Sequence, residues 1–226
     1  MKTVVVGPLQ CNCQIIVCAE THQAVIVDPG DDADRILNEI KKIENELKQS
    51  VQIKMLLHTH AHFDHFAATA AVHKALQQQM GGKPTICLHQ DDAFLYEKLI
   101  EQGNLFGFHF SAPQPVDRFI ADNEEWAVGN LKFCALHTPG HSPGGLCFRL
   151  KENSQRSVPE TLFSGDTLFR ESVGRSDLWG GDEKILKKSI QERIYTLDEA
   201  TPVWPGHGLA TEIGYEKRHN PFVNGK

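Results

Sequence analysis

Four histidines within eight residues constrain this chain more than any other feature of its sequence. They lie in the segment His58-Thr59-His60-Ala61-His62-Phe63-Asp64-His65, whereas twelve histidines spread evenly over 226 residues would place only about 0.4 of a histidine in such a window. The segment follows the apolar run 53–57, which predicts a buried strand, and overlaps the start of the alanine-rich stretch 64–79, which predicts a helix. The fold must therefore accommodate a histidine-rich loop between a strand and a helix.

The spacing within this loop suits metal binding. Residues two apart can project to the same side after a strand, so His60 and His62 can hold one metal ion. Asp64 and His65, at the start of the predicted helix, can face a second position. Imidazole and carboxylate ligands together favour zinc, manganese or iron over calcium or copper(I).

A metal ion needs three or four ligands, so the loop predicts partners elsewhere in the chain. Three candidates follow predicted strands and lie beside small residues, which allow close approach of the backbone. They are His141 in Thr138-Pro139-Gly140-His141-Ser142-Pro143-Gly144, Asp166 in Ser164-Gly165-Asp166-Thr167, and His207 in Pro205-Gly206-His207-Gly208. Each signal is weak alone, but together with the loop they predict a shared metal centre.

Strands outnumber helices in the predicted organisation. Apolar and β-branched runs predict strands at 3–6, 14–18, 24–27, 53–57, 85–88, around Ile120, 131–136, 146–150, 161–163 and 202–204. Apolar residues at helical spacing predict helices at 32–47, 64–79, 91–102, 182–197 and 211–218, with Gly81-Gly82 ending the second. Most strands are close enough in sequence for hairpins, and helices occur in both halves. We therefore expect an α+β fold of two mixed sheets with helices on their outer faces, rather than a doubly wound parallel sheet.

Length and charge limit the architecture and the partners. A chain of 226 residues fits one domain spanning 1–226, and no repeat or linker marks a boundary. With 23 Lys and Arg against 29 Asp and Glu, the net charge is -6. This is the wrong sign for binding phosphates, so we expect no nucleic-acid partner. No apolar stretch approaches the roughly 20 residues of a membrane span, so we expect no membrane partner; the sequence makes no prediction about oligomeric state.

The six cysteines indicate a reducing compartment. They are Cys11, Cys13, Cys18, Cys87, Cys134 and Cys147. The N-terminus lacks the apolar core of a signal peptide, and cysteines in such a chain are more often reduced thiols than disulfides. We therefore predict a cytoplasmic location. A soft-metal site at Cys11, Cys13 and Cys18 would lack a fourth ligand, so we interpret these residues as apolar strand positions.

These motifs make the chain resemble the metallo-β-lactamase-fold hydrolases nearly end to end. The resemblance rests on Thr59-His60-x-His62-x-Asp64-His65, His141, Asp166 and His207, and on Asp28 in Val27-Asp28-Pro29-Gly30, which is similar to the family's first motif. Within the family, the segments 165–169 and 138–144 most resemble the glyoxalase II (hydroxyacylglutathione hydrolase) group. The ending from Pro205 to Phe222 is similar to the short bacterial glyoxalase II-like proteins.

The resemblance implies an αββα sandwich with a two-metal centre along one edge. In that arrangement His60, His62 and His141 hold metal one, Asp64, His65 and His207 hold metal two, and Asp166 bridges them. Two divalent ions, zinc first with iron or manganese as alternatives, would activate a shared water for attack on the carbonyl of a thioester such as S-D-lactoylglutathione. Asp64 and Asp166 are thus the expected catalytic residues, and Asp28 would orient a ligand histidine from behind the centre.

Other interpretations compete with this one. In the same fold, a single iron held by His60, His141 and Asp166 would indicate a persulfide dioxygenase. The complete second ligand set and the ending Pro205-Gly206-His207 favour the hydrolase. A nuclease is disfavoured by the net charge, and a non-catalytic metal-binding protein by the complete ligand set. His58 and His137 adjoin the motifs, and we predict packing or structural roles for both.

The sequence contains few signals for substrate recognition. Full-length glyoxalase II enzymes continue past the last histidine into a helical segment with basic residues for glutathione, whereas fewer than twenty residues follow His207 here. Arg175, nine positions after Asp166, matches a lysine that contacts glutathione in that group and could hold a substrate carboxylate through two hydrogen bonds. A structural ion pair between Arg175 and Asp177 is an equal alternative, and Arg170 is a weaker candidate for recognition.

Overall fold

The apolar runs of the sequence form two six-stranded sheets. The computed structural model describes residues 1–80, 83–109, 112–151 and 159–224. The first sheet has the order β1 (Lys2–Val6), β2 (Cys11–Val17), β3 (Gln23–Val27), β4 (Gln52–Leu57), β5 (Thr85–Leu88) and β6 (Arg118–Phe119). The second has the order β14 (Thr211–Glu212), β13 (Pro202–Pro205), β10 (Thr161–Gly165), β9 (Leu146–Leu150), β8 (Leu131–His137) and β7 (Glu125–Val128). Both sheets contain parallel and antiparallel pairs, so the prediction of mixed sheets is confirmed.

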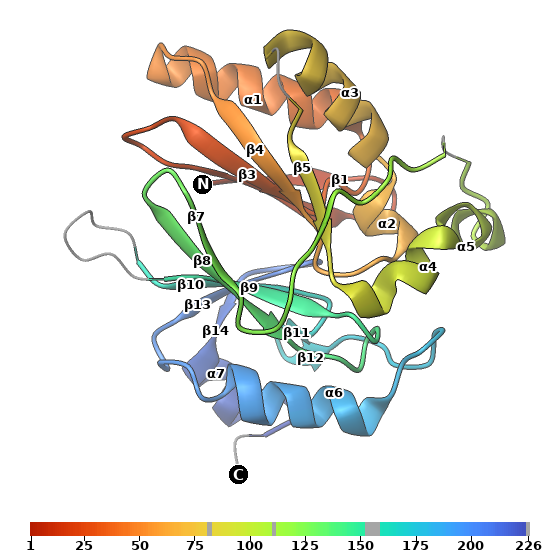
Figure 1. The fold of residues 1–226 in the computed structure, drawn as a ribbon. Coiled ribbons are helices and arrows are strands. Elements are labelled where there is room, and N and C mark those ends of the chain that lie inside the picture. The colour runs from red at the N-terminus through yellow and green to blue at the C-terminus, as the bar shows by residue number, and fades with distance from the viewer. Residues whose placement is uncertain (81–82, 110–111, 152–158, 225–226) are drawn as a thin grey trace.

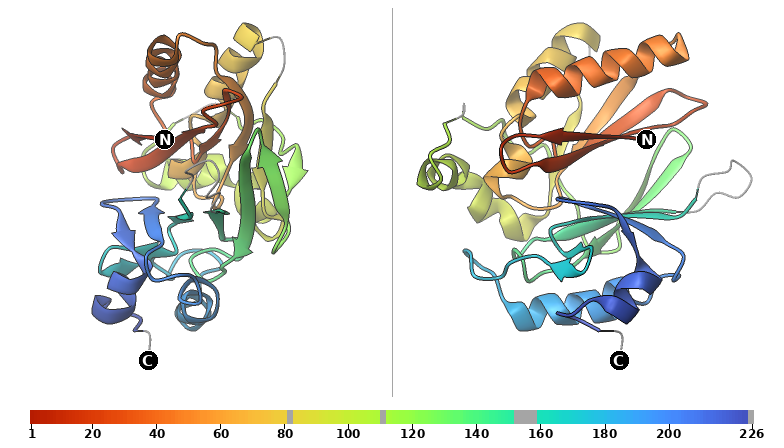
Figure 2. Two further views of the ribbon diagram at one scale, coloured as in Figure 1. Left: turned by 90° about the vertical axis from the view of Figure 1, so that its left-hand side faces the viewer. Right: turned by 180° about the vertical axis from the view of Figure 1, so that it is seen from behind.

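Helices cover the outer face of each sheet. Figure 1 shows α1 (Ala33–Leu47) and α3 (Thr69–Met80) outside the first sheet, and α6 (Glu183–Ser189) and α7 (Ile213–His219) outside the second. In α1 the buried residues Ile36, Ile40 and Ile43 recur every three or four positions, which turns one face of the helix toward the sheet. The two further views in Figure 2 show the same four layers, as the predicted αββα sandwich requires. No helix in the described ranges is long and apolar enough to cross a membrane.

The central core lies between the two sheets. Strands of both sheets contribute to one buried cluster that includes Val25, Leu57, Phe133, Phe148 and Phe163. Separate clusters lie under the helices on either side. β3 is therefore buried on both faces, which explains why it reads as a continuous apolar run rather than as an alternating one.

Three predicted helices differ in detail from the structure. The helix expected at 64–79 is two helices, α2 (Phe63–Phe66) and α3, because the Ala68 N–H donates to the Pro29 carbonyl instead of continuing the first helix. The helix expected at 91–102 is a 3-10 turn, η1 (Gln90–Asp92), followed by α4 (Ala93–Glu97) and α5 (Leu99–Leu105). The helix expected at 182–197 is α6 followed by a π-helical turn, η3 (Ile190–Ile194).

Other local differences are small. The strands β7, β11 (Leu168–Phe169) and β12 (Ser172–Val173) were not predicted, because they are too short or too polar to show a period. The helix expected from residue 211 begins at Ile213, after β14. Gly81 and Gly82, predicted to end a helix, lie outside the described residues.

Strand direction brings the histidine and aspartate turns to one edge of the sandwich. β3 and β4 are parallel, with Val27 opposite Leu57, and β10 and β13 are parallel, with Gly165 opposite Pro205. β8 runs in the same direction as β10, because both are antiparallel to β9. The carboxyl ends of these parallel strands meet at a shared edge, which is the usual place for a binding site in sheets of this kind.

The core between the sheets makes a testable contribution to stability. Phe148 is 0% exposed, so Phe148→Ala should lower the free energy of unfolding by about 3–5 kcal/mol through lost burial and a residual cavity. Phe222→Ala is the control, because Phe222 is 52% exposed, and it should change stability by less than about 0.5 kcal/mol. Urea unfolding measures both. Equal, small losses would contradict the role of Phe148 in the core.

Candidate metal centre

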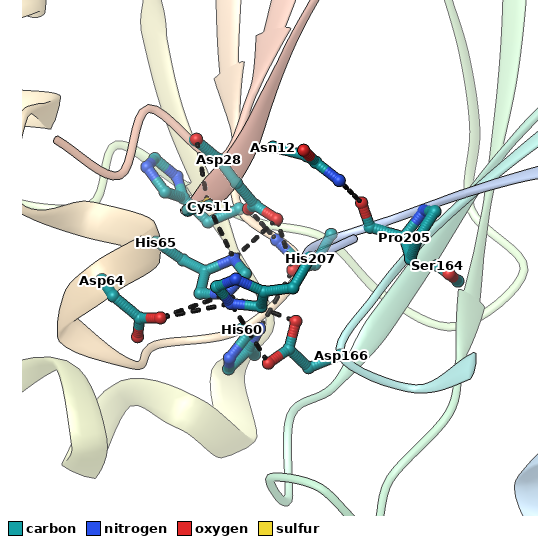
Figure 3. Close-up of polar contacts among 12 residues, drawn as sticks. Cys11, Asn12, Asp28, His60, Asp64, His65, Ser164, Asp166, Pro205 and His207 are labelled. Atoms are coloured by element: carbon teal, nitrogen blue, oxygen red, sulfur yellow. Dashed lines mark hydrogen bonds and ion pairs between the residues drawn. The ribbon is translucent and has the colours of Figure 1, made fainter. Parts of the chain in front are cut away.

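The seven predicted ligands come together at the shared edge. His60, His62, Asp64 and His65 follow β4, and the partners from the second sheet follow β8, β10 and β13. Ligand atoms lie within 4.8 Å of one another in each of three groups: His60, His62 and His141; His60, His65 and Asp166; and Asp64, His65 and His207. The groups share His60 and His65, so they form one continuous centre with room for two positions. Figure 3 shows His60, Asp64, His65, Asp166 and His207 converging, with Asp28 next to His65.

Asp28 orients two of the histidines. Its Oδ2 lies 3.0 Å from His65 Nδ1 and accepts a hydrogen bond from the Thr59 hydroxyl at 2.7 Å, and its Oδ1 accepts from the Thr59 N–H at 2.8 Å. The single hydroxyl hydrogen of Thr59 is used in the hydrogen bond to Asp28, so the hydroxyl oxygen accepts a hydrogen bond from His60 Nδ1 at 3.0 Å. Both imidazoles therefore carry their proton on Nδ1 and direct the Nε2 lone pair into the centre.

Backbone carbonyls orient two histidines of the other sheet in the same way. His141 Nδ1 lies 2.6 Å from the Arg175 carbonyl oxygen, and His207 Nδ1 lies 3.3 Å from the Gln10 carbonyl oxygen. A carbonyl oxygen only accepts, so Nδ1 is the donor in both rings. The Nε2 atoms of His141 and His207 are thus left to face the centre.

These nitrogens lie close enough to repel each other unless a proton or a metal ion lies between them. His60 Nε2 lies 3.1 Å from His141 Nε2, and His65 Nε2 lies 3.2 Å from His207 Nε2. Asp166 lies beside both pairs: its Oδ1 is 3.4 Å from His65 Nε2, and its Oδ2 is 3.6 Å from His141 Nε2 and from His207 Nε2. Asp166 Oδ1 is buried and has no hydrogen-bond partner among the described residues. Facing lone pairs beside an unpartnered carboxylate oxygen fit divalent metal ions.

The protonation states of most of the ligands also suit metal binding. Burial, followed by the neighbouring His65 and His141, holds the pKa of His60 well below its usual value, and burial with His141 lowers the pKa of His62 to about 3. Burial opposes the charged form of Asp166, but His65 and the other imidazoles outweigh it and lower the pKa of this carboxyl. Burial opposes the charged forms of His65 and His207, but the nearby carboxylates, Asp166 among them, outweigh it and raise the pKa values of both rings. Neutral imidazole and ionised carboxylate are the forms that bind metals, so a metal ion held by His65 and His207 would displace their protons.

A cavity of about 380 Å³ opens onto the centre. His62, Asp64, His141, Asp166 and His207 line its floor. Its wall is largely apolar and is formed by Leu9, Phe63, Leu95, Leu105, Phe106, Leu178 and Trp179, with Gln102. Several of these wall residues are exposed large hydrophobic side chains, which is unusual unless they contact another molecule.

The Arg175 side chain lies at the cavity and also forms an ion pair. Its side chain lines the cavity, while its Nε and one terminal nitrogen donate to Asp177 at 2.7 and 2.9 Å. The pair is largely exposed. Cavity lining and the ion pair with Asp177 therefore occur together, and the predicted contact with substrate stays a prediction. Arg170 instead lies over the Tyr215 ring, 5.5 Å from its centroid.

The neighbouring histidines have structural surroundings. His58 is fully buried, bonded through its ring nitrogens to the Cys87 carbonyl and the Thr69 hydroxyl, and stacked on Phe66. His137 bonds to the Pro143 carbonyl at 2.8 Å. The packing roles predicted for both agree with these contacts.

Sequence reasoning missed several residues that position the ligands. Asn12 donates to the carbonyls of Pro205 and Gly208, at 3.0 and 2.9 Å, and so holds the turn that carries His207. Asn12 lies in a segment noted only for its cysteines, and no metal-capable group among the described residues contains a cysteine. Thr59 stood inside the histidine motif without an assigned role, although its place beside His60 was the available signal.

Comparison with known proteins gives a consistent result. A model of the Metallo-beta-lactamase superfamily matches residues 6–207. Hydroxyacylglutathione hydrolase GloC of Haemophilus influenzae is 33% identical over 227 residues, covering 100% of this chain and 99% of that protein. The solved structure of TTHA1623 in a di-iron-bound form has a TM-score of 0.82 and 35% identity, covering 99% of this chain and 100% of that chain. The structure of BLEG-1 B3 metallo-beta-lactamase has a TM-score of 0.83 and 34% identity, covering 98% of both chains.

The role of Asp28 is testable without an activity assay. In Asp28→Asn, the amide N–H would face a donor of Thr59 or His65 in either orientation, so zinc affinity should fall about ten- to a hundredfold. Asparagine tolerates the left-handed backbone at this position, where φ is 51°. Competition with a chromophoric chelator measures the affinity.

Asp32→Asn is the matched control, because Asp32 also has a positive φ, of 49°, and is bonded to Gly7 and Arg35 rather than to the centre. It should bind zinc as the wild type does. An Asp28→Asn variant with the affinity of this control would contradict the orienting role.

Proposed function

The chain belongs to the metallo-beta-lactamase superfamily, and we propose that it is a binuclear metal-dependent hydrolase of thioesters. The observation that carries the proposal is the pair of facing Nε2 contacts, 3.1 and 3.2 Å, with the Asp166 carboxylate beside both. His60, His62 and His141 would hold one ion, Asp64, His65 and His207 the other, with Asp166 between them. Two divalent ions held there would lower the pKa of a shared water and polarise a carbonyl oxygen.

Zinc is the first candidate for both positions, with iron or manganese next. Imidazole and carboxylate ligands suit all three metals. The similar protein TTHA1623 is described in a di-iron-bound form, which keeps iron among the candidates here.

Asp64 is suited to handle the proton of the attacking water. Its Oδ2 lies 3.3 Å from His207 Nε2, and its side chain lines the cavity. Burial alone would raise its pKa, but His65 and His207 outweigh burial and keep the pKa below the usual value. An ionised Asp64 at neutral pH can orient a water molecule and accept its proton.

A thioester suits the rest of the cavity. A thiolate leaving group needs little protonation, so a separate general acid is not required. The described residues around the cavity include no lysine, tyrosine or cysteine that would serve as one. Similarity to the hydroxyacylglutathione hydrolase GloC of Haemophilus influenzae supports S-D-lactoylglutathione or a related acyl-thiol as the substrate.

Recognition would combine one charge with an apolar wall. We assign Arg175 to a carboxylate of the substrate and the exposed Phe106 and Trp179 to its apolar part, because all three line the cavity that opens on the centre. The partner is thus a small molecule. The cytoplasmic location and the single domain spanning 1–226 stay predictions from the sequence.

Metal content and paired assays test the proposal. Protein purified without added metal should contain about two divalent ions per chain by elemental analysis and should hydrolyse acyl-thiols. Asp166→Asn should lower metal content and reduce kcat by about ten- to a hundredfold, because a neutral amide cannot balance two cations. The exposed Asp34→Asn is the control and should match the wild type. One firmly bound iron per chain, persulfide oxidation and indifference to His207→Ala would replace the hydrolase with the dioxygenase.

The role of Arg175 has its own test. Arg175→Ala should raise KM about ten- to a hundredfold for thioesters that carry a carboxylate, with a smaller change in kcat, because the lost contact is mostly uniform binding. Neutral thioesters should be affected much less. Arg170→Ala, which removes a guanidinium outside the cavity lining, is the control. Equal losses for charged and neutral substrates, with a lowered Tm, would assign Arg175 to the ion pair with Asp177 alone.

A further inference from the structure

Asp92 is a buried carboxylate outside the predicted ligand set. It ends the turn η1 and is 0% exposed. No lysine or arginine among the described residues forms an ion pair with it. Its Oδ2 accepts from the Ala61 N–H at 2.9 Å and from the Ser142 hydroxyl at 2.8 Å, and its Oδ1 accepts from the Gly144 N–H at 2.5 Å. A carboxylate is costly to bury unless donors of this kind compensate it.

The donors belong to the two loops that carry the ligands of metal one. Ala61 lies between His60 and His62 in the sequence, and Ser142 directly follows His141. The two loops come from different sheets, and Asp92 bonds to both of them. It therefore fixes the separation of three imidazoles, although none of the hydrogen bonds described for its side chain goes to an imidazole.

Two further contacts indicate that this arrangement is specific. Gln102 donates to the Ala61 carbonyl at 3.0 Å, so Ala61 is held through its N–H by Asp92 and through its C=O by Gln102. A Cβ atom on Gly144 would lie 2.6 Å from the Asp92 nitrogen and 2.7 Å from its Cγ. Only glycine at that position lets the carboxylate enter between the loops.

We propose that Asp92 is a positioning residue that holds the His60–His62 loop and the His141 loop at the separation required by metal one. The proposal rests on the metal-binding part of the proposed function. The sheets do not depend on Asp92, because the Leu146 N–H donates to the Thr59 carbonyl at 2.7 Å and already joins the two loops where they leave their strands. Loss of the Asp92 carboxylate should therefore affect metal one and spare metal two.

Asp92→Asn tests this role with little change in volume. All three partners of the carboxylate donate, so the amide N–H would face the N–H of Ala61 or of Gly144 in either orientation. The probe is zinc alone, measured by competition with a chromophoric chelator in two single-site backgrounds. His207→Ala removes a ligand of metal two, so this background reports zinc binding at metal one. His62→Ala removes a ligand of metal one, so this background reports zinc binding at metal two.

In the His207→Ala background, Asp92→Asn should weaken zinc binding about tenfold or more. In the His62→Ala background it should change zinc binding by less than about twofold, which is within ordinary mutational scatter. Asp117→Asn is the control in both backgrounds, because Asp117 accepts from the Ile86 N–H away from the ligand loops. Equal weakening in the two backgrounds, or none in His207→Ala, would overturn the positioning role.

A milder variant covers the case in which Asp92→Asn does not fold. Ser142→Ala removes one of the three donors and leaves both carboxylate oxygens with a partner. It should weaken zinc binding about twofold to tenfold in the His207→Ala background and leave the His62→Ala background unchanged. Unchanged binding in both would overturn the proposal. A wild-type chain that binds no zinc would instead refute the proposed function.

Discussion

The position of one proton on each of four ligand imidazoles organises the whole centre. In His60, His65, His141 and His207, Nδ1 is hydrogen-bonded to an oxygen. The Nε2 atom of each ring then faces the Nε2 atom of another ligand at 3.1 or 3.2 Å, a separation that suits two ligands of one metal ion. Uncompensated, these facing lone pairs would repel. The oxygens that hold the Nδ1 protons are therefore as important as the ligands, because they preserve an arrangement that only a cation makes favourable.

The sandwich determines how far apart the two halves of this centre lie. The first sheet supplies His60, His62, Asp64 and His65, and the second supplies His141, Asp166 and His207. The core between the sheets, with Phe133, Phe148 and Phe163, thus sets the separation of the two ligand groups. Metal ions bound across the sheets would in turn stabilise the packed sandwich over the unfolded chain. Two buried carboxylates, Asp28 and Asp92, refine the geometry close to the metals.

The floor of the cavity is held by hydrogen bonds, whereas much of its wall is exposed to solvent. Of the floor imidazoles, His62 and His141 are buried, and His141 and His207 are bonded to backbone carbonyls. The wall residues Leu105, Phe106 and Trp179 are exposed and lie on α5 or on irregular segments. Reaction chemistry needs fixed atoms, whereas selectivity among substrates can change through exposed loops. Substrate preference is therefore more open to variation in this fold than metal binding.

The sequence by itself determined most of the strands, the two mixed sheets with outer helices and the seven candidate ligands, because periodicity and local motifs record which residues are buried and where turns follow strands. It did not indicate the break after α2, which depends on the Ala68 N–H reaching Pro29, or the use of the Gln10 and Arg175 carbonyls as acceptors. Asp92 read only as part of a helix start, yet it bonds to Ser142, fifty residues away. Such contacts join segments that have no pattern in common, so only the packing of the two sheets decided them.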